Sequence, residues 1–191
     1  MRSALHFLGQ AATNFRQTGA IAPSSARLAR ALADAVGDLP AGSAIIELGP
    51  GSGCVTEALR LRHPDCTVLA VENNPSFARR LSDRLPAVSV VSGCASALPE
   101  HLRAVGIDRG RVAAVVSGLP LLSLPDELVE RILDAVRAVL PCGRRFVQFT
   151  YSQRAFRRLD QGGFRAEAPR RVWLNMPPAV VLTFTRTGAA A

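Results

Sequence analysis

Residues 44–53 read Ala-Ile-Ile-Glu-Leu-Gly-Pro-Gly-Ser-Gly, an apolar run that ends in three closely spaced glycines. A second apolar run, at residues 67–71, is closed by an acid, Glu72. A chain that leaves a strand and turns at once into a helix needs positive φ angles and a backbone that a ligand can approach, and glycine supplies both. The stretch therefore predicts a strand, a glycine turn, a helix and a second strand, an arrangement typical of a site for a nucleoside-containing cofactor.

The spacing of the glycines separates two kinds of cofactor. Gly49, Gly51 and Gly53 follow the pattern Gly-x-Gly-x-Gly, whereas the dinucleotide fingerprint is Gly-x-Gly-x-x-Gly, and position 54 is Cys. A dehydrogenase is therefore the weaker interpretation. Glu47 places a carboxylate at the carboxyl end of the first strand, where it attracts a cofactor with a cationic amino-acid tail and repels a pyrophosphate. These features favour S-adenosylmethionine.

The acid that closes the second strand has a separate predicted role. Glu72 lies 19 residues after Gly53, which is the length that one helix and one strand take up. Its carboxylate is placed to accept hydrogen bonds from both ribose hydroxyls of the cofactor.

Length and charge bound the range of functions. A chain of 191 residues can form one domain with a substantial core. All 23 basic residues are Arg, and the net charge of +8 favours an anionic partner, either nucleic acid or an anionic membrane. The four cysteines are scattered, so we expect neither a disulfide framework nor a metal site, but reduced thiols in a cytoplasm. The apolar run at 112–124 is too short to span a bilayer, and no secretion signal is expected.

Beyond the glycine turn the chain alternates strands and helices. We expect helices at 26–36, 55–62, 75–85, 98–105 and 125–140, further strands at 88–91, 112–116 and 145–150, and a closing hairpin of strands 171–174 and 179–185. Parallel β/α units of this kind form a doubly wound sheet with right-handed crossovers. The predicted fold is α/β and Rossmann-like, with a seven-stranded, mostly parallel sheet and a C-terminal antiparallel hairpin.

Over residues 24–186, the glycine turn, Glu72 and the closing hairpin resemble the class I S-adenosylmethionine-dependent methyltransferases. The resemblance places the adenine beside Cys94 and Ala95, where many members have Asp in place of Cys94. It also implies a loop facing the methyl acceptor after the fourth strand. The cofactor-binding set that follows is Glu47, Gly49, Gly51, Gly53, Glu72, Asn73, Cys94, Ala95, Ser117 and Gly118.

The start of the chain carries no acid before Asp34. On a helical wheel, residues 1–17 separate an apolar face from a polar one. Such a helix can pack on the protein core or lie in a lipid interface, and the net charge favours the membrane, where each Arg contributes about 1 kcal/mol near anionic lipids. We expect residues 1–17 to bind membrane, 18–187 to form the methyltransferase domain and 188–191 to be a tail. The predicted membrane residues are Leu5, Phe7, Leu8, Phe15 and Arg16.

Three segments, 18–33, 47–53 and 117–125, closely resemble the bacterial phospholipid N-methyltransferases that convert phosphatidylethanolamine to phosphatidylcholine. The resemblance implies an amphipathic membrane-binding helix at the start and catalysis at the membrane surface. Phe149-Thr150-Tyr151 matches an aromatic continuation of the fifth strand, and a tyrosine there can face a methylated ammonium or simply pack at the rim. The predicted substrate-binding residues are Ile21, Pro23, Ser24, Leu119, Pro120 and Tyr151.

Methyl transfer from a sulfonium is an in-line displacement, so the protein has to align the amine and remove its proton. Deprotonating an alkylammonium at neutral pH costs about 4–5 kcal/mol. Tyr151 is the predicted catalytic residue, orienting the nitrogen, and no general base is assigned. His63 and His101 are expected on the surface.

Two alternatives remain open. The ribosomal RNA adenine dimethyltransferases share the fold and the positive charge, but their acceptor loop holds the base with an amide and an aromatic ring, and Ser117-Gly118-Leu119-Pro120-Leu121 lacks both. A catalytically silent cofactor-binding module is the other. We expect a membrane surface with anionic lipids and a phospholipid as partners, no nucleic acid, and a monomer at the cytoplasmic face of the inner membrane. The arginines of 144–171 are expected beside the site.

Overall fold

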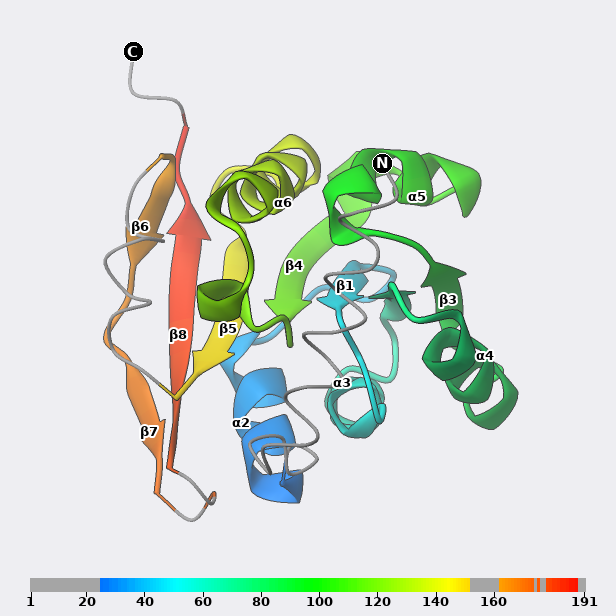
Figure 1. The fold of residues 1–191 in the computed structure, drawn as a ribbon, viewed down its shortest axis with the longest axis horizontal. Helices are drawn as coiled ribbons and strands as arrows, with labels where there is room; N and C mark the ends of the chain where they lie inside the picture. The colour runs from blue at the N-terminus through cyan, green and yellow to red at the C-terminus, as the bar shows by residue number, and fades with distance from the viewer. Residues whose placement is uncertain (1–24, 152–161, 174, 176–177, 189–191) are drawn as a thin grey trace.

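The computed structural model describes residues 25–151, 162–173, 175 and 178–188. Its sheet has eight strands in the order β3-β2-β1-β4-β5-β8-β6, with β7 also paired to β8 (Figure 1). The strands are β1 (Ala44–Leu48), β2 (Thr67–Glu72), β3 (Ser89–Ser92), β4 (Val112–Ser117), β5 (Arg145–Thr150), β6 (Phe164–Ala166), β7 (Arg170–Val172) and β8 (Ala179–Arg186). The predicted membrane helix and the predicted substrate residues Ile21, Pro23 and Ser24 lie outside the described residues.

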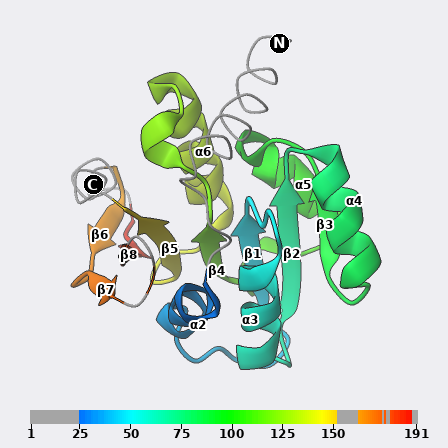
Figure 2. The ribbon, with the colours of Figure 1, turned by 60° about the horizontal axis from the view of Figure 1, so that its bottom comes forward.

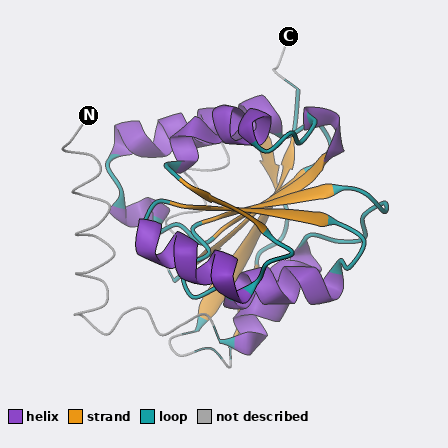
Figure 3. Ribbon diagram, turned by 90° about the vertical axis from the view of Figure 1, so that its right-hand side faces the viewer, coloured by secondary structure: helices purple, strands orange, loops and turns teal. Residues whose placement is uncertain are grey.

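Helices cover both faces of the sheet, as the side view shows (Figure 3). The helices are α2 (Ala26–Ala35), α3 (Cys54–Arg62), α4 (Pro75–Arg84), α5 (Leu98–Ala104) and α6 (Asp126–Val139). Buried residues of α2, α3 and α4 form one apolar cluster with the sheet, and those of α5 and α6 form the other. Because both faces are covered, all residues of β1 and β4 are buried, which explains their continuous apolar runs.

The strand order reverses between β1 and β4, which lie side by side in the middle of the sheet (Figure 2). In open α/β sheets ligands bind outside the carboxyl ends of the strands at such a reversal. We call the side of the molecule where β1, β2, β4 and β5 end the carboxyl edge. The glycine turn and the loop after β4 both lie there, so the topology brings together the predicted cofactor and acceptor segments.

The closing part of the sheet differs from the prediction in one respect. The hairpin of β7 and β8 is present, but the position beside β8 is shared by two short strands, β6 and β7, so the sheet has eight strands and not seven. Ala166 pairs with Phe184 and Arg170 with Val181, so this side of the ladder contains one residue more than β8. Pro169 lies in the extra stretch and has no N–H for the ladder, which accounts for the interruption.

Two expectations about polar side chains were wrong. His63 is 5% exposed, with Nε2 3.2 Å from the Ala33 carbonyl oxygen, because the chain leaves α3 beneath α2. The described arginines of 144–171 do not share one side, and Arg154, Arg157 and Arg158 lie outside the described residues. Arg165 pairs with Thr185, which pairs with Arg145 at the start of β5, so these arginines lie at the opposite edge from the site. Arg170 and Arg171, opposite Val181 and Val180, lie level with the end of β5.

Candidate active site

The glycine turn has the geometry that its sequence predicts. Gly49, Gly51 and Gly53 have φ angles of 70°, 53° and 80°, and the turn delivers the chain into α3 at Cys54. A Cβ at Gly49 would come within 2.7 Å of Leu119 Cδ2, so this residue is packed against the loop after β4. A Cβ at Gly51 would meet nothing within 4 Å. The middle of the turn therefore faces open space, where a cofactor can approach the backbone.

The Glu72 carboxylate fixes the same turn from the side. It is 8% exposed, and its Oε2 accepts a hydrogen bond from the Gly51 N–H at 3.1 Å, while Oε1 accepts from the Asn74 N–H at 2.9 Å. A carboxylate can accept more than two hydrogen bonds, so the predicted ribose contacts are compatible with these. Asn73, another predicted contact, lies between the two bonded segments and is partly exposed. Glu72 thus has a structural role that the sequence did not reveal.

The Glu47 carboxylate is buried beneath the turn. It is 1% exposed and burial raises its pKa to about 7, with the Glu72 charge adding to the shift and the nearby Thr56 hydroxyl opposing it. Its Oε2 has no hydrogen-bond partner among the described residues. A buried acceptor without a partner is costly unless a ligand satisfies it. A cationic amino-acid tail would do so, and this orphaned oxygen fits the predicted cofactor.

The predicted adenine side is built by the chain after β3. The Gly93 N–H donates to the Glu72 carbonyl oxygen at 2.9 Å, and Cys94 Sγ lies 3.1 Å from Ser96 Oγ. His101 Nε2 lies 3.0 Å from the Cys94 carbonyl oxygen, so this histidine is partly buried and braces the segment from α5. A Cβ at Gly93 would come within 2.5 Å of the His101 ring. The sequence did not anticipate this bracing of the Cys94–Ala95 segment.

The loop after β4 is held against the glycine turn. The Gly118 N–H donates to the Leu48 carbonyl oxygen at 2.8 Å, and a Cβ at Gly118 would come within 2.7 Å of the Gly49 carbonyl oxygen. Ser117 is fully buried, and its Oγ accepts from the Leu119 N–H at 3.3 Å. Leu119 and Pro120 are partly exposed. The predicted cofactor and acceptor segments are therefore in direct contact.

Gln148, in β5, is a site residue that the sequence analysis missed. It is 3% exposed, and its Nε2 donates to the carbonyl oxygens of Leu119 at 3.0 Å and Phe149 at 2.7 Å. Its Oε1 is buried with no partner among the described residues. The one available signal was a polar residue inside an otherwise apolar strand end, since Gln148 stands between Val147 and Phe149. Gln148 fixes the position of the acceptor loop.

Tyr151 follows β5 directly and lies at the carboxyl edge, as the sequence requires. Its ring is 38% exposed and stands edge-on to Phe149, with ring centroids 5.7 Å apart and an interplanar angle of 81°. The exposed part of the ring is available to a substrate, and its predicted role in orienting the amine stays a prediction. Among the described residues no group of three or more His, Cys, Asp or Glu side chains is placed to hold a metal ion.

The fold, the glycine turn and the two carboxylates define a class I methyltransferase. No protein-family profile matches the chain. It is 36% identical over 190 residues to an ornithine lipid N-methyltransferase of Singulisphaera acidiphila, a match that covers 94% of each chain. The chain therefore belongs to the bacterial lipid N-methyltransferases.

Solved structures bear out the fold. The 1,6-didemethyltoxoflavin-N1-methyltransferase of Burkholderia thailandensis matches with a TM-score of 0.69 at 17% identity, over 98% of this chain and 89% of that one. The N-methyltransferase NodS of Bradyrhizobium japonicum matches with a TM-score of 0.63 at 16% identity, over 87% and 89%. Both hold S-adenosylhomocysteine, the product that S-adenosylmethionine leaves after methyl transfer. Both of those enzymes therefore bind the product of the cofactor that the glycine turn of this chain predicts.

Proposed function

We propose that the chain transfers methyl groups from S-adenosylmethionine to the aliphatic amine of a membrane lipid headgroup, and that this lipid is an ornithine lipid. The observation that carries the proposal is the 36% identity, over nearly the whole chain, to an ornithine lipid N-methyltransferase. Phosphatidylethanolamine is the second candidate, supported by the resemblance of the 117–125 segment to the phospholipid N-methyltransferases. Both lipids present a primary alkylamine, which the site would only have to align with the methyl group of the cofactor.

Separate sets of side chains would bind the cofactor and position the methyl acceptor. Glu47 and Glu72 would hold the amino-acid tail and the ribose of the cofactor, and the open space at Gly51 would admit it. The cofactor supplies an electrophilic methyl group on a sulfonium. The amine would first lose a proton to solvent, and its lone pair would then accept the methyl group while S-adenosylhomocysteine leaves. The Tyr151 ring can attract the ammonium before deprotonation and the methylated ammonium after transfer. Gln148 and Ser117 keep the acceptor loop against the glycine turn, so that donor and acceptor meet in one geometry.

The loop after β4 argues against a nucleobase as the acceptor. A flipped or unpaired base is normally stacked on an aromatic side chain and hydrogen-bonded along its edge. Leu121 follows Pro120, at the position where the stacking ring would be needed, and it is an aliphatic residue that is only 6% exposed. Unmodified ribosomal RNA is therefore the substrate against which a lipid acceptor has to be compared.

Membrane attachment completes the proposal. The substrate amine is anchored in a bilayer, so the carboxyl edge has to face the headgroups, and an amphipathic helix at residues 1–17 would hold it there. The enzyme would then work as a peripheral protein at the cytoplasmic face of the inner membrane. None of the described helices is both long and apolar enough to cross a membrane.

A substrate panel tests the proposal. The full chain is incubated with methyl-labelled S-adenosylmethionine and vesicles that contain either ornithine lipid or phosphatidylethanolamine, or with unmodified ribosomal RNA. We expect label in ornithine lipid, at a rate at least tenfold above phosphatidylethanolamine. Faster labelling of phosphatidylethanolamine would make it the substrate, and label in RNA alone would overturn the proposed class of acceptor.

A further inference from the structure

Exposed apolar side chains gather at the carboxyl edge. Four large apolar residues of the described chain are exposed, and three of them, Leu122, Tyr151 and Trp173, follow the ends of β4, β5 and β7. Leu61, the fourth, lies near the far end of α3. Trp173 is 66% exposed, although tryptophan gains more than most residues from burial. An apolar partner at this edge would therefore cover ring surface that the fold leaves in water.

The turn that carries Trp173 extends beyond the end of β5. Val172 pairs with Ala179, one residue before the Val180 that pairs with Thr150, so Trp173 is the next residue outward. The Arg171 guanidinium carbon lies 5.2 Å from the Trp173 ring centroid. An amphipathic aromatic ring beside an arginine is a combination suited to the boundary between lipid tails and headgroups.

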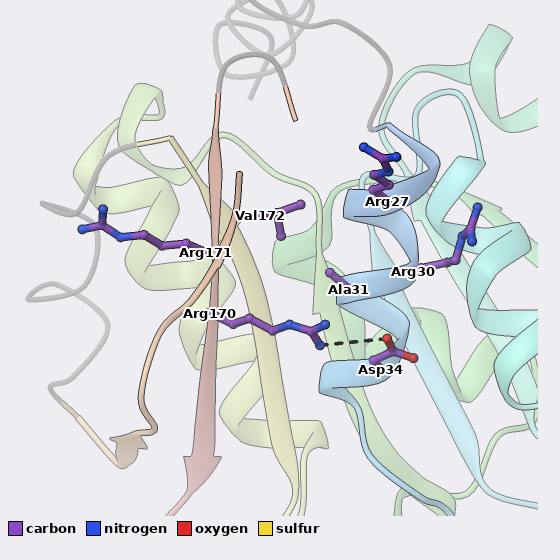
Figure 4. Close-up of a pocket in the computed structure, with 7 residues that line it drawn as sticks. All are labelled: Arg27, Arg30, Ala31, Asp34, Arg170, Arg171 and Val172. Atoms are coloured by element: carbon purple, nitrogen blue, oxygen red, sulfur yellow. Dashed lines mark ion pairs between the residues drawn. The ribbon is translucent and has the colours of Figure 1, made fainter. Parts of the chain in front are cut away.

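A further arginine stands across from this turn, on α2. The Arg145 side chain, at the start of β5, donates a hydrogen bond to the Ala35 carbonyl oxygen at 3.2 Å. The C-terminal end of α2 therefore lies at the edge opposite the carboxyl edge. The N-terminal end of α2, which carries Arg27, lies at the carboxyl edge. Between α2 and β7 runs an open depression of about 250 Å³ (Figure 4). Arg170 reaches across it to Asp34, at 3.9 Å, while Arg171 points to the other side of the strand.

The charges of Arg27 and Arg171 are not neutralised by a described carboxylate. Arg170, by contrast, shares Asp34 with Arg62. Two exposed guanidinium groups on either side of β7, with an exposed tryptophan at its end, present both the charge and the apolar ring that an anionic bilayer surface would complement.

We propose that Arg27, Arg171 and Trp173 form a membrane contact of their own, which binds an anionic lipid surface independently of the substrate and directs the carboxyl edge toward the headgroups. This contact rests on the proposed function only in that the acceptor is a membrane lipid. The arginines bind lipid phosphates and the tryptophan ring lies among the headgroups. The contact therefore sets the orientation of the site, whereas a helix at residues 1–17 would provide attachment alone.

The chain contains a single tryptophan, so its fluorescence reports on this contact directly. The full chain is titrated with vesicles of phosphatidylcholine and phosphatidylglycerol that contain no substrate lipid, with pure phosphatidylcholine vesicles, and with ribosomal RNA. We expect a blue shift, and quenching by brominated lipid, with the anionic vesicles only. Protein that sediments with those vesicles without a blue shift, or that does not bind them at all, would overturn the proposal, as would a shift with RNA alone.

A charge-reversal pair separates a specific contact from general attraction. The R27E/R171E variant and the control R109E/R165E each lower the net charge from +8 to +4, and the control residues lie at the opposite edge. We expect R27E/R171E to weaken vesicle binding at least tenfold, and the control to weaken it about threefold or less. Equal losses in the two variants would refute the contact. Both variants should bind S-adenosylhomocysteine as the parent protein does. Because vesicle binding is measured without any methylation, this test can fail while the substrate panel succeeds, and the reverse.

Discussion

The cofactor half of the site, at the ends of β1 and β2, and the acceptor half, at the ends of β4 and β5, are stabilised in different ways. In the cofactor half, glycines with positive φ shape the turn, and the buried Glu72 carboxylate accepts hydrogen bonds from the N–H of Gly51 in the turn and from the N–H of Asn74 after β2. In the acceptor half, a single amide side chain, Gln148, holds the Leu119 carbonyl. Both halves are held by a side chain from a neighbouring strand, Glu72 of β2 and Gln148 of β5, but only the cofactor half contains a recognisable sequence motif.

The largest expected effect comes from the buried acid of the cofactor half. Burial raises the pKa of Glu47 from its ordinary value of 4.5 to about 7 in the folded protein, so between these pH values the folded state keeps a proton that the unfolded state has lost. Stability without ligand therefore falls as pH rises through this window, by at most about 3 kcal/mol. Urea unfolding from pH 4.5 to pH 8 should show this fall in the parent protein and not in Glu47→Gln.

Cofactor binding should change with pH in the opposite sense. The ionised Glu47 carboxylate attracts the cationic tail, so affinity for S-adenosylmethionine should rise as pH approaches and passes 7, and Glu47→Gln should bind weakly at every pH. Parallel pH profiles for the parent and the variant, in unfolding and in calorimetry alike, would show that Glu47 does not titrate in this range.

Glu72 should have the next largest effect. Its removal in Glu72→Ala leaves the Gly51 and Asn74 N–H groups without their carboxylate acceptor and removes the ribose contact, so cofactor affinity should fall about 100-fold, or about 3 kcal/mol. The matched control is Glu57→Ala, which removes an exposed carboxylate that pairs with Arg84. Calorimetry with S-adenosylhomocysteine measures both. An unchanged affinity in Glu72→Ala would move the ribose contact to another residue.

Gly118 tests the junction between the two halves. A methyl group in Gly118→Ala would lie against the Gly49 carbonyl oxygen, so the loop and the turn would have to separate, at a cost of about 1–3 kcal/mol. Thermal unfolding should show the loss, and both cofactor affinity and turnover should fall together. Gly188→Ala is the control, since a Cβ there meets nothing within 4 Å. Equal melting temperatures for Gly118→Ala and Gly188→Ala would show that the acceptor loop and the glycine turn are not in close contact.

Gln148 should have the smallest and most selective effect. Gln148→Leu keeps a side chain of similar volume but removes the hydrogen bond to the Leu119 carbonyl oxygen, so the acceptor loop loses about 1 kcal/mol of stabilisation. The KM for lipid should rise about fivefold to tenfold with S-adenosylhomocysteine affinity unchanged. Weaker S-adenosylhomocysteine binding with an unchanged KM for lipid would show that Gln148 acts through the glycine turn.

The sequence predicted most of the strands and helices and the backbone geometry of the glycine turn, because burial on both faces and closely spaced glycines leave local patterns. Arg145–Thr150 was predicted to the residue. Strand β6 was not predicted, because Phe164–Ala166 is a three-residue run with an arginine at its centre and is too short to show an alternating pattern. His63 and Gln148 were missed because their burial depends on α2 and on the acceptor loop, which are distant in sequence. The predicted roles of Tyr151 and of residues 1–17 remain predictions.

The most direct test of the account is the mass of the lipid product. Vesicles that contain equal amounts of ornithine lipid and phosphatidylethanolamine are incubated with the full chain and S-adenosylmethionine, and the extracted lipids are analysed by mass spectrometry, with Glu72→Ala as the inactive control. The account predicts added methyl groups on the ornithine lipid headgroup, absent with the variant. Vesicle lipids that stay unmodified, under conditions in which the protein binds S-adenosylmethionine, would contradict it.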